Sequence, residues 1–334
     1  MIEKKAVAVF SAKPYDKAFF KSESDERIHF QYFDFSLNVE NATIANNFQV
    51  ISAFVNDDLG RNVLTILANG GTKLIALRSA GYNHVDLLAA QELGITIVNV
   101  PAYSPYAVAE HTIALMLSLS RNLPRAYNRV RDGNFSLNGL LGFDFYGKVV
   151  GIIGGGKIGR LVGERLRAFG CHVLIADPIN GELCRSEGFE VVDNDQVFER
   201  SDIISLHCPL VSQTRHLVND DTIAKMKKGV MLINMSRGGL IDTRSVLTAL
   251  KAHHVGYLGI DVYEEEGSLF FEDHSSEIIQ DDVFQRLITF PNVMITGHQA
   301  YFTRDALEHI AQSTVSNIVS FFDNKPLDNL VKVD

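Results

Sequence analysis

The residues best suited to chemistry begin with a glycine turn in the middle of the chain. An apolar run, 149–153, leads directly into Gly154-x-Gly156-x-x-Gly159, and an amphipathic helix pattern follows. The first glycine allows a tight turn, the second lets a pyrophosphate approach the backbone, and the third lets helix and strand pack closely. Free N–H groups at the helix start would face the pyrophosphate. This order predicts a dinucleotide site, and the alternative is a glycine-rich turn without a ligand.

An acidic residue then ends the next predicted strand, 172–176. Asp177 stands where a carboxylate can accept hydrogen bonds from a ribose 2′-hydroxyl. Its charge would repel a 2′-phosphate, and the following Pro-Ile-Asn offers no arginine to receive one. The sequence therefore favours NAD over NADP.

A hydride-transfer enzyme must also hold its substrate and supply a proton. Arg237 follows the predicted strand 230–234, and its planar guanidinium suits a carboxylate. The alternative is an exposed arginine before a loop. Small residues at Ala80 and Gly81, after another strand, could offer N–H groups to an anion, or form an ordinary turn.

Carboxylates cluster after the predicted strand 257–260. Asp261 is followed by Glu264, Glu265 and Glu266. A run of this kind is usually a solvated face, and we expect this to hold for at least one of the three glutamates and to extend to a second. No histidine stands at ligand spacing beside them, so no metal site is predicted.

Histidine is the natural acid–base candidate near neutral pH. His298 follows the predicted strand 293–296 and stands at the expected edge of a sheet. His207, His111 and the pair 253–254 are alternatives. Spacing alone does not rank these histidines.

Short apolar runs alternate with helical patterns along the chain, which predicts parallel sheets in an α/β fold. The expected strands are 6–11, 29–33, 50–55, 74–79, 95–100, 149–153, 172–176, 190–192, 203–206, 230–234, 257–260 and 293–296. Helices are expected at 61–68, 85–93, 107–121 and 306–322. The segment 264–282 is acidic and is expected to form an irregular excursion at the surface.

Composition excludes several classes of protein. With 334 residues, the chain is long enough for about two domains. A net charge of −9 argues against nucleic-acid binding, and no apolar run is long enough to span a membrane. Three cysteines without metal-ligand spacing favour a reducing compartment.

Several separate segments together resemble the D-specific 2-hydroxyacid dehydrogenase family, most closely its bacterial fermentative D-lactate dehydrogenases. The likeness covers nearly the whole chain. Besides the glycine turn, it is carried by Phe54-Val-Asn-Asp, Ile75-Ala-Leu-Arg-Ser-Ala-Gly-Tyr-Asn, Val100-Pro-Ala-Tyr-Ser-Pro, Ala109-Glu-His, Ser205-Leu-His-Cys-Pro, Asn234-Met-Ser-Arg-Gly, Gly259-Ile-Asp-Val-Tyr-Glu and Thr296-Gly-His-Gln-Ala. Many members have a proline before the histidine, whereas Gly297 stands here, as in the fermentative lactate enzymes.

The resemblance implies roles that spacing left open. The implied catalytic residues are Arg237, Glu266 and His298, with His298 as proton donor and Glu266 as its partner. The implied cofactor-binding residues are Gly154, Gly156, Lys157, Ile158, Gly159, Asp177, Cys208, Pro209, Thr214, Met235, Ser236, Arg237 and Asp261. The implied substrate-binding residues are Ala80, Gly81, Arg237 and His298, with Phe54, Tyr103 and Tyr301 around a pocket for a methyl group.

The resemblance also implies the architecture and the activity. Two Rossmann-like or flavodoxin-like domains with parallel sheets are expected, with the active site in the cleft between them. Residues 1–102 with 300–334 would bind substrate, and residues 103–299 would bind NAD. The expected reaction is reduction of pyruvate to D-lactate by NADH, in a cytoplasmic homo-oligomer, either a dimer or a tetramer.

Two other functions remain open. The chain could be another D-2-hydroxyacid dehydrogenase, acting on a branched 2-oxo acid, 3-phosphoglycerate or glyoxylate, although no basic cluster serves a phosphorylated substrate. It could also be a non-enzymatic NADH sensor, like the transcriptional corepressors of related fold. The complete set of Arg237, Glu266 and His298 argues against that loss of chemistry.

Overall fold

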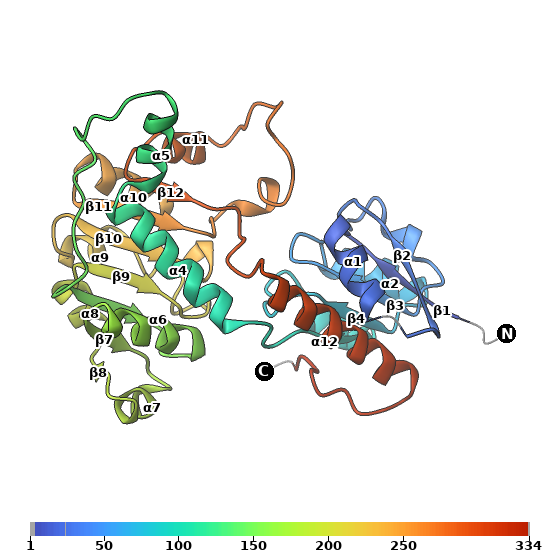
Figure 1. Ribbon diagram of the computed structural model, residues 1–334. Coiled ribbons are helices and arrows are strands. Elements are labelled where there is room, and N and C mark those ends of the chain that lie inside the picture. The colour runs from blue at the N-terminus through green and yellow to red at the C-terminus, as the bar shows by residue number, and fades with distance from the viewer. Residues whose placement is uncertain (1–3, 24, 333–334) are drawn as a thin grey trace. The chain divides into compact units, whose positions relative to one another are not determined.

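The computed structural model describes residues 4–23 and 25–332 (Figure 1). The chain divides into two compact units. Unit 1 is formed by Met1–Ser104 with Phe302–Asp334, and unit 2 by Pro105–Tyr301. Among the described residues, no helix is both long enough and apolar enough to cross a membrane.

Unit 1 is built on a five-stranded sheet with the order β2-β1-β3-β4-β5. Every neighbouring pair in it is parallel. Its elements are β1 (Lys5–Val9), α1 (Pro14–Ser22), β2 (Ile28–Tyr32), η1 (Ala42–Ala45), β3 (Val50–Ala53), α2 (Arg61–Asn69), β4 (Leu74–Leu77), α3 (Leu87–Glu92), β5 (Thr96–Val98) and α12 (Arg304–Phe322). This strand order is that of flavodoxin-like folds.

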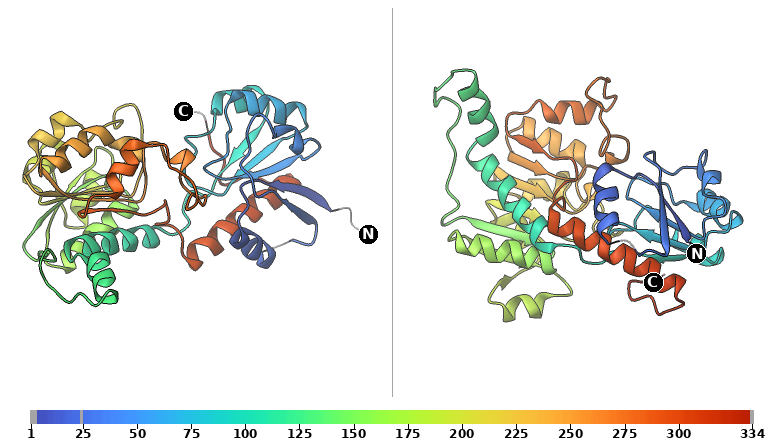
Figure 2. Two further views of the ribbon diagram at one scale, coloured as in Figure 1. Left: turned by 90° about the horizontal axis from the view of Figure 1, so that it is seen from above. Right: turned by 45° about the vertical axis from the view of Figure 1, so that its right-hand side comes forward.

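Helices cover both faces of this sheet because its strand residues alternate between two cores. Val7 and Val9 of β1 pack with Val315 of α12 on one face, where α1 lies beside α12 (Figure 2). Ala8, between them, packs with Leu64 of α2 on the other face. Side chains in a strand point alternately to opposite faces, so one short strand supplies both cores.

Unit 2 is built on a seven-stranded sheet with the order β12-β11-β10-β9-β6-β7-β8. All of its pairs are also parallel. Its elements are α4 (Pro105–Ser120), α5 (Leu123–Arg131), β6 (Val149–Ile153), α6 (Lys157–Ala168), β7 (His172–Ala176), α7 (Gly181–Ser186), β8 (Glu190–Val191), α8 (Asn194–Arg200), β9 (Ile203–Leu206), α9 (Asp220–Lys225), β10 (Val230–Asn234), η2 (Gly238–Leu240), α10 (Thr243–Lys251), β11 (Val255–Ile260), η3 (Glu266–Ser268), α11 (Asp282–Ile288) and β12 (Val293–Ile295). The strand order reverses between β6 and β9, which is the arrangement of dinucleotide-binding folds.

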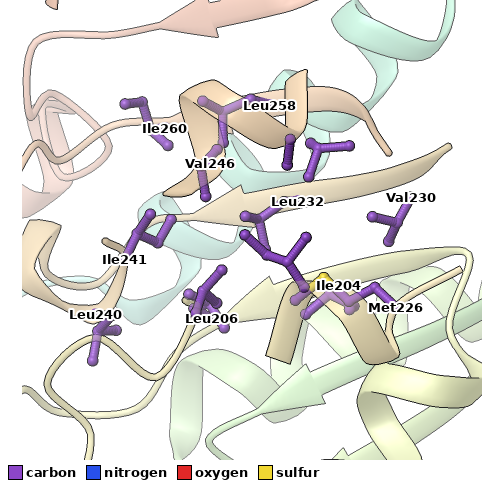
Figure 3. Packing of buried hydrophobic residues seen from close by; sticks show 14 of the residues in the cluster. Ile204, Leu206, Met226, Val230, Leu232, Leu240, Ile241, Val246, Leu258 and Ile260 are labelled. Atoms are coloured by element: carbon purple, nitrogen blue, oxygen red, sulfur yellow. The ribbon is translucent and has the colours of Figure 1, made fainter. Parts of the chain in front are cut away.

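A large core of unit 2 lies on one face of this sheet (Figure 3). Leu206 of β9, Leu232 of β10 and Leu258 of β11 meet Val246 of α10 there, and each is at most 2% exposed. Burial of such a side chain contributes roughly 1.5–3 kcal/mol. This packing holds the strands, and so the loops at their carboxyl ends, in fixed relative positions within the unit.

The predicted fold class of two parallel α/β sheets is confirmed, and each expected strand is present with its ends shifted by at most a few residues. One expectation is wrong in part. The segment 264–282 is irregular apart from η3 and the first residue of α11, but Phe270 within it is only 7% exposed and packs in the core of unit 2. Its apolar side chain outweighs the acidic surroundings that suggested a surface excursion.

Candidate active site

The residues predicted for cofactor binding and catalysis follow the strands of the seven-stranded sheet. The glycine turn follows β6, Asp177 follows β7, Cys208 to Thr214 follow β9, Met235 to Arg237 follow β10, Asp261 to Glu266 follow β11, and His298 follows β12. Because the strands are parallel, all these loops lie at one edge of the sheet, where ligands bind in doubly wound folds.

The glycine turn leaves room for an anion at the start of α6. Gly154 has a φ of +105°, and a Cβ there would lie 2.5 Å from backbone atoms of the segment after β9. A Cβ at Gly159 would collide with the carbonyl oxygen of Gly154. At Gly156, by contrast, a Cβ would meet nothing within 4 Å, and α6 has no side-chain cap. Lys157 and Ile158 are the first residues of α6. The N-terminus of this helix can therefore accept a pyrophosphate through its backbone N–H groups.

Asp177 is fixed beside this turn by backbone donors. Its Oδ2 accepts a hydrogen bond from the N–H of Gly155 at 2.6 Å, and its Oδ1 accepts from Ile179 at 2.8 Å and Asn180 at 2.6 Å. Desolvation pushes the pKa of Asp177 upward, but the hydrogen bonds outweigh it and hold the pKa below its ordinary value. The carboxylate is therefore charged and oriented at neutral pH, as a ribose-binding acid must be.

The loops after β9 and β10 are joined to each other. The hydroxyl of Ser236 donates to the carbonyl oxygen of Cys208 at 2.6 Å. Thr214 closes its own loop by donating from Oγ1 to the carbonyl oxygen of Pro209 at 2.6 Å. Burial raises the pKa of the Cys208 thiol to about 11, so this cysteine is a neutral thiol and no nucleophile.

Arg237 projects from a turn that a buried asparagine holds. Asn234, fully buried at the end of β10, donates to the carbonyl oxygen of Arg237 at 2.8 Å and accepts from the N–H of Ser236 at 3.0 Å. Met235, between them, is buried. The guanidinium donates to the carbonyl oxygen of Ser236 at 2.7 Å and forms no ion pair within the described residues. Its remaining donors are available to an anionic ligand.

His298 and Glu266 form a pair in unit 2. The Nδ1 atom of His298 lies 2.9 Å from Oε1 of Glu266, and the two side chains are 20% and 24% exposed. The other oxygen, Oε2, accepts from the N–H of Tyr263 at 2.9 Å, which fixes the carboxylate. The Nε2 atom of His298 has no hydrogen-bond partner in the described part of the chain, so it is the atom that can exchange a proton with a ligand.

Asp261 holds the loop that carries His298. Its carboxylate, 1% exposed, accepts from Thr296 Oγ1 at 2.5 Å and from the backbone N–H groups of Gln299 at 2.9 Å and Ala300 at 2.8 Å. The N–H of His298 donates to the carbonyl oxygen of Asp261 at 2.8 Å. His298 has a φ of +51°, a conformation that such surrounding bonds must maintain. A cofactor contact was the role implied for Asp261, and its clamping role was missed because the partners come from a later loop.

Three of the other histidines named from the sequence have side-chain contacts of their own. His207 Nε2 lies 2.8 Å from Ser205 Oγ, and desolvation lowers the pKa of His207 to about 4, so it is neutral at physiological pH. His111 Nε2 lies 3.1 Å from Thr296 Oγ1, and His254 Nε2 donates to the carbonyl oxygen of Met226 at 3.0 Å. These contacts distinguish the three from His298, whose Nε2 has no partner among the described residues.

The acidic run contributes two bound carboxylates and one exposed one. Glu264 Oε1 lies 2.5 Å from Nε2 of His216, which lies in the loop after β9. Glu266 pairs with His298, and Glu265 is exposed. The expectation of at least one solvated glutamate holds for Glu265, whereas its extension to a second is wrong, because Glu264 has a partner distant in sequence.

In unit 1, the loop after β4 has two carbonyl groups that accept side-chain hydrogen bonds. The carbonyl oxygen of Ala80 accepts from Asn99 Nδ2 at 2.8 Å, and that of Gly81 accepts from Ser79 Oγ at 2.7 Å. The N–H groups of Ala80 and Gly81 have no partner among the described residues. A loop with bound carbonyls and open N–H groups suits an anion.

The three aromatic residues predicted for a substrate pocket differ in burial. Phe54 follows β3 in unit 1 and is 9% exposed, Tyr103 follows β5 and is half-buried, and Tyr301 in unit 2 is 8% exposed. Burial of this extent fits a packing role as well as a pocket wall, so their contact with substrate stays a prediction.

These features of unit 2 fit a dinucleotide. The open space at Gly156, the uncapped start of α6 and the fixed carboxylate of Asp177 match the pyrophosphate and the adenosine ribose. Within the described residues, no group of histidines, cysteines and carboxylates could hold a metal ion.

Comparison with known proteins agrees with this fit. Residues 113–300 match the D-isomer specific 2-hydroxyacid dehydrogenase NAD-binding domain. D-lactate dehydrogenase of Escherichia coli is 49% identical over 93% of this chain and 95% of its own. The solved pyruvate reductase of Chlamydomonas reinhardtii has a TM-score of 0.91 and 41% identity, covering 98% of this chain and 99% of that one.

A third relative was solved with ligands. D-lactate dehydrogenase of Aquifex aeolicus, in complex with NAD and lactic acid, has a TM-score of 0.88 and 32% identity over 98% of this chain and 99% of that chain. Extent and identity of this order establish the family. The chain belongs to the D-isomer specific 2-hydroxyacid dehydrogenases and is an NAD-dependent enzyme of that family.

Proposed function

We propose that this enzyme reduces pyruvate to D-lactate with His298 as the proton donor. The observation that carries the proposal is the pair of His298 Nδ1 and Glu266 Oε1 at 2.9 Å, with Nε2 left open at the carboxyl edge of the nucleotide-binding sheet. Relatives named for D-lactate dehydrogenase and pyruvate reductase support pyruvate as the substrate.

When bound, NADH supplies the hydride that adds to the carbonyl carbon of the 2-oxo acid. His298 transfers the proton on Nε2 to the carbonyl oxygen as that oxygen gains charge. The carboxylate of Glu266 stabilises the protonated imidazole and fixes Nδ1 as the atom facing away from substrate. General acid catalysis of this kind contributes about 10²–10⁴-fold to the rate.

Two sets of groups are proposed for the substrate carboxylate. Unit 2 offers the guanidinium of Arg237, and unit 1 offers the N–H groups of Ala80 and Gly81. Phe54, Tyr103 and Tyr301 are proposed to restrict the substrate side chain to a methyl group. One extra methylene changes discrimination by only about 1–3 kcal/mol, so 2-oxobutyrate and glyoxylate should react slowly.

The direct test is loss of NADH absorbance with a panel of 2-oxo acids, run in reverse with D- and L-lactate. We expect the highest kcat/KM with pyruvate and oxidation of D-lactate alone. A higher kcat/KM for a branched 2-oxo acid would replace pyruvate as the substrate. NADH binding without turnover of any acid would instead indicate a sensor.

Glu266→Gln is expected to move the alkaline limb of the pyruvate-reduction profile to lower pH. Reduction requires protonated His298, and the substitution removes the negative charge that stabilises this form. The profile of kcat against pH is the measurement.

The matched control is Glu265→Gln, since Glu265 is the exposed neighbour. Its profile should coincide with that of the wild type. An alkaline limb that stays in place in Glu266→Gln would argue against the pairing with His298.

Asp177→Asn is expected to weaken the preference for NADH over NADPH. The amide keeps a hydrogen-bonding oxygen but loses the charge that repels a 2′-phosphate, so kcat/KM for NADPH should rise by about tenfold, or about 1.4 kcal/mol. Because the pKa of Asp177 lies below its ordinary value, the wild-type preference should persist under mildly acidic conditions and weaken only as pH falls through that lowered pKa.

Kinetics with both cofactors measure this preference, and Asp195→Asn serves as a control with an exposed aspartate of unit 2. Equal wild-type rates with NADH and NADPH would contradict the assignment of Asp177.

We also infer a reducing compartment such as the cytoplasm as the enzyme's setting, because Cys171, Cys184 and Cys208 are buried free thiols.

A further inference from the structure

A buried arginine lies directly before the anion-binding loop of unit 1. Arg78 is 2% exposed, although it is among the residue types that are seldom fully buried. The backbone N–H of Arg78 donates to the carbonyl oxygen of Ala53 at 3.0 Å, which continues the pairing of β3 and β4 one residue beyond the end of β4. None of the cofactor or catalytic roles argued above uses this side chain.

The guanidinium of Arg78 joins the ends of three neighbouring strands. Its Nη2 donates to the carbonyl oxygen of Phe10, just after β1, at 2.8 Å. Its Nη1 donates to the carbonyl oxygen and the hydroxyl of Ser52 in β3, both at 3.2 Å. Its Nε lies 3.4 Å from Oδ1 of Asp16. Arg78 itself follows β4, so one planar group fixes the carboxyl ends of β1, β3 and β4 together.

The same guanidinium lies against Phe54, one of the residues proposed to restrict the substrate side chain. The Cζ atom of Arg78 is 5.5 Å from the centre of the Phe54 ring, within cation–π range. Asp57, 2% exposed, holds the other side of this residue by accepting from the N–H of Phe54 at 2.6 Å. Phe54 is thus held at its backbone by a carboxylate and at its ring by a cation.

Arg78 therefore connects two features that a 2-oxo acid would contact. The N–H groups of Ala80 and Gly81 follow it in the chain, and the ring of Phe54 lies beside its side chain. The carboxylate and the side chain of a 2-oxo acid are separated by only the carbonyl carbon. The spacing between the N–H groups and the ring then sets how large a side chain can be accommodated.

We propose that Arg78 is a positioning residue that fixes the carboxylate-binding loop relative to Phe54 and thereby sets the size of 2-oxo acid the enzyme prefers. The inference rests on the proposed function, which assigns Ala80, Gly81 and Phe54 to the substrate. This positioning role explains why a charged arginine is buried at a site where a neutral side chain would avoid the cost of desolvation.

The test is Arg78→Lys, measured with pyruvate and 2-oxobutyrate. A lysine ammonium keeps the charge but lacks the fork that reaches two strands at once. We expect KM for pyruvate to rise by about tenfold while kcat changes much less, and the kcat/KM ratio of pyruvate to 2-oxobutyrate to fall by a similar factor. The dissociation constant of NADH should stay unchanged, since the glycine turn and Asp177 belong to unit 2.

A milder variant covers the case in which Arg78→Lys does not fold. Ser52→Ala removes one acceptor, the hydroxyl 3.2 Å from Nη1, and leaves the carbonyl contact in place. It should shift the substrate ratio in the same direction by less. Arg61→Lys is the matched control, because Arg61 is an exposed arginine of unit 1 that pairs with Glu92 at 2.6 Å.

The outcomes separate this inference from the proposed function. Wild-type enzyme that turns over none of the 2-oxo acids would overturn the proposed function and this role with it. Active wild-type enzyme with a folded Arg78→Lys of unchanged KM and substrate ratio would overturn the role of Arg78 alone. If Arg78→Lys does not fold, an unchanged ratio in Ser52→Ala overturns it. A loss confined to thermal stability would show a purely structural arginine.

Discussion

Replacing His298 by alanine is expected to lower kcat for pyruvate reduction by about 10²–10⁴-fold, with the affinity for NADH nearly intact. The variant removes the only atom proposed to give a proton to the carbonyl oxygen. It leaves the glycine turn and Asp177 unchanged, because those groups belong to other loops of the sheet. Steady-state kinetics and NADH fluorescence titration measure the two quantities.

The left-handed backbone of His298 calls for a second variant. Alanine at a φ of +51° is strained, whereas asparagine tolerates this region better. His298→Asn should therefore lose as much activity as His298→Ala while disturbing the loop less. His172→Ala is the control, since His172 is an exposed histidine of unit 2 that pairs with Glu190. Near-normal turnover in His298→Asn would remove His298 from the proton-donor role.

Much of the frame around His298 is predictable from sequence because the strands carry local signals. β6, β7, β9 and β10 are short apolar runs bounded by glycine or polar residues, and their observed ends coincide with the predicted ones. Strands buried on both faces of a parallel sheet need such continuous apolar runs. The edge at which the site loops lie then follows from strand direction alone.

Pairing between side chains is less predictable, because it depends on residues far apart in the chain. Glu264 and Glu266 are near neighbours in sequence, yet one binds His216 and the other binds His298. The resemblance to a known family supplied Glu266, whereas spacing favoured solvent for two of the three glutamates. The clamp of Asp261 on the His298 loop had no local signal, since a buried and an exposed aspartate look alike in sequence.

Arg78 shows the same limit in unit 1. Its position after a strand suggested an ordinary turn or an anion-binding loop, and both readings concern the residues that follow it. Its side chain contacts Phe10, just after β1, and Ser52 of β3, and these two strands pair only in the folded sheet. The burial of Arg78 and its hydrogen-bond partners can therefore be recognised only once the strand order is known.

Arg237→Lys is expected to raise KM for pyruvate and to lower kcat, so that kcat/KM falls by about 10–100-fold. Loss of a hydrogen bond to a charged group costs roughly 1.5–3 kcal/mol, which corresponds to that range. Lysine keeps the positive charge but presents a point donor, so it can neither grip a carboxylate with two parallel bonds nor orient the carbonyl face.

The turn that carries Arg237 makes this variant a clean test of the guanidinium. Asn234 holds the turn through backbone groups, at the N–H of Ser236 and the carbonyl oxygen of Arg237, and both remain in the lysine variant. Arg244→Lys, at an exposed arginine of α10, is the matched control and should keep wild-type kinetics. Because the same guanidinium is proposed to bind the carboxylate and to orient the carbonyl group, KM and kcat should change together. If both constants stay at wild-type values, the substrate carboxylate is held by other groups, and the N–H groups of Ala80 and Gly81 become the first candidates.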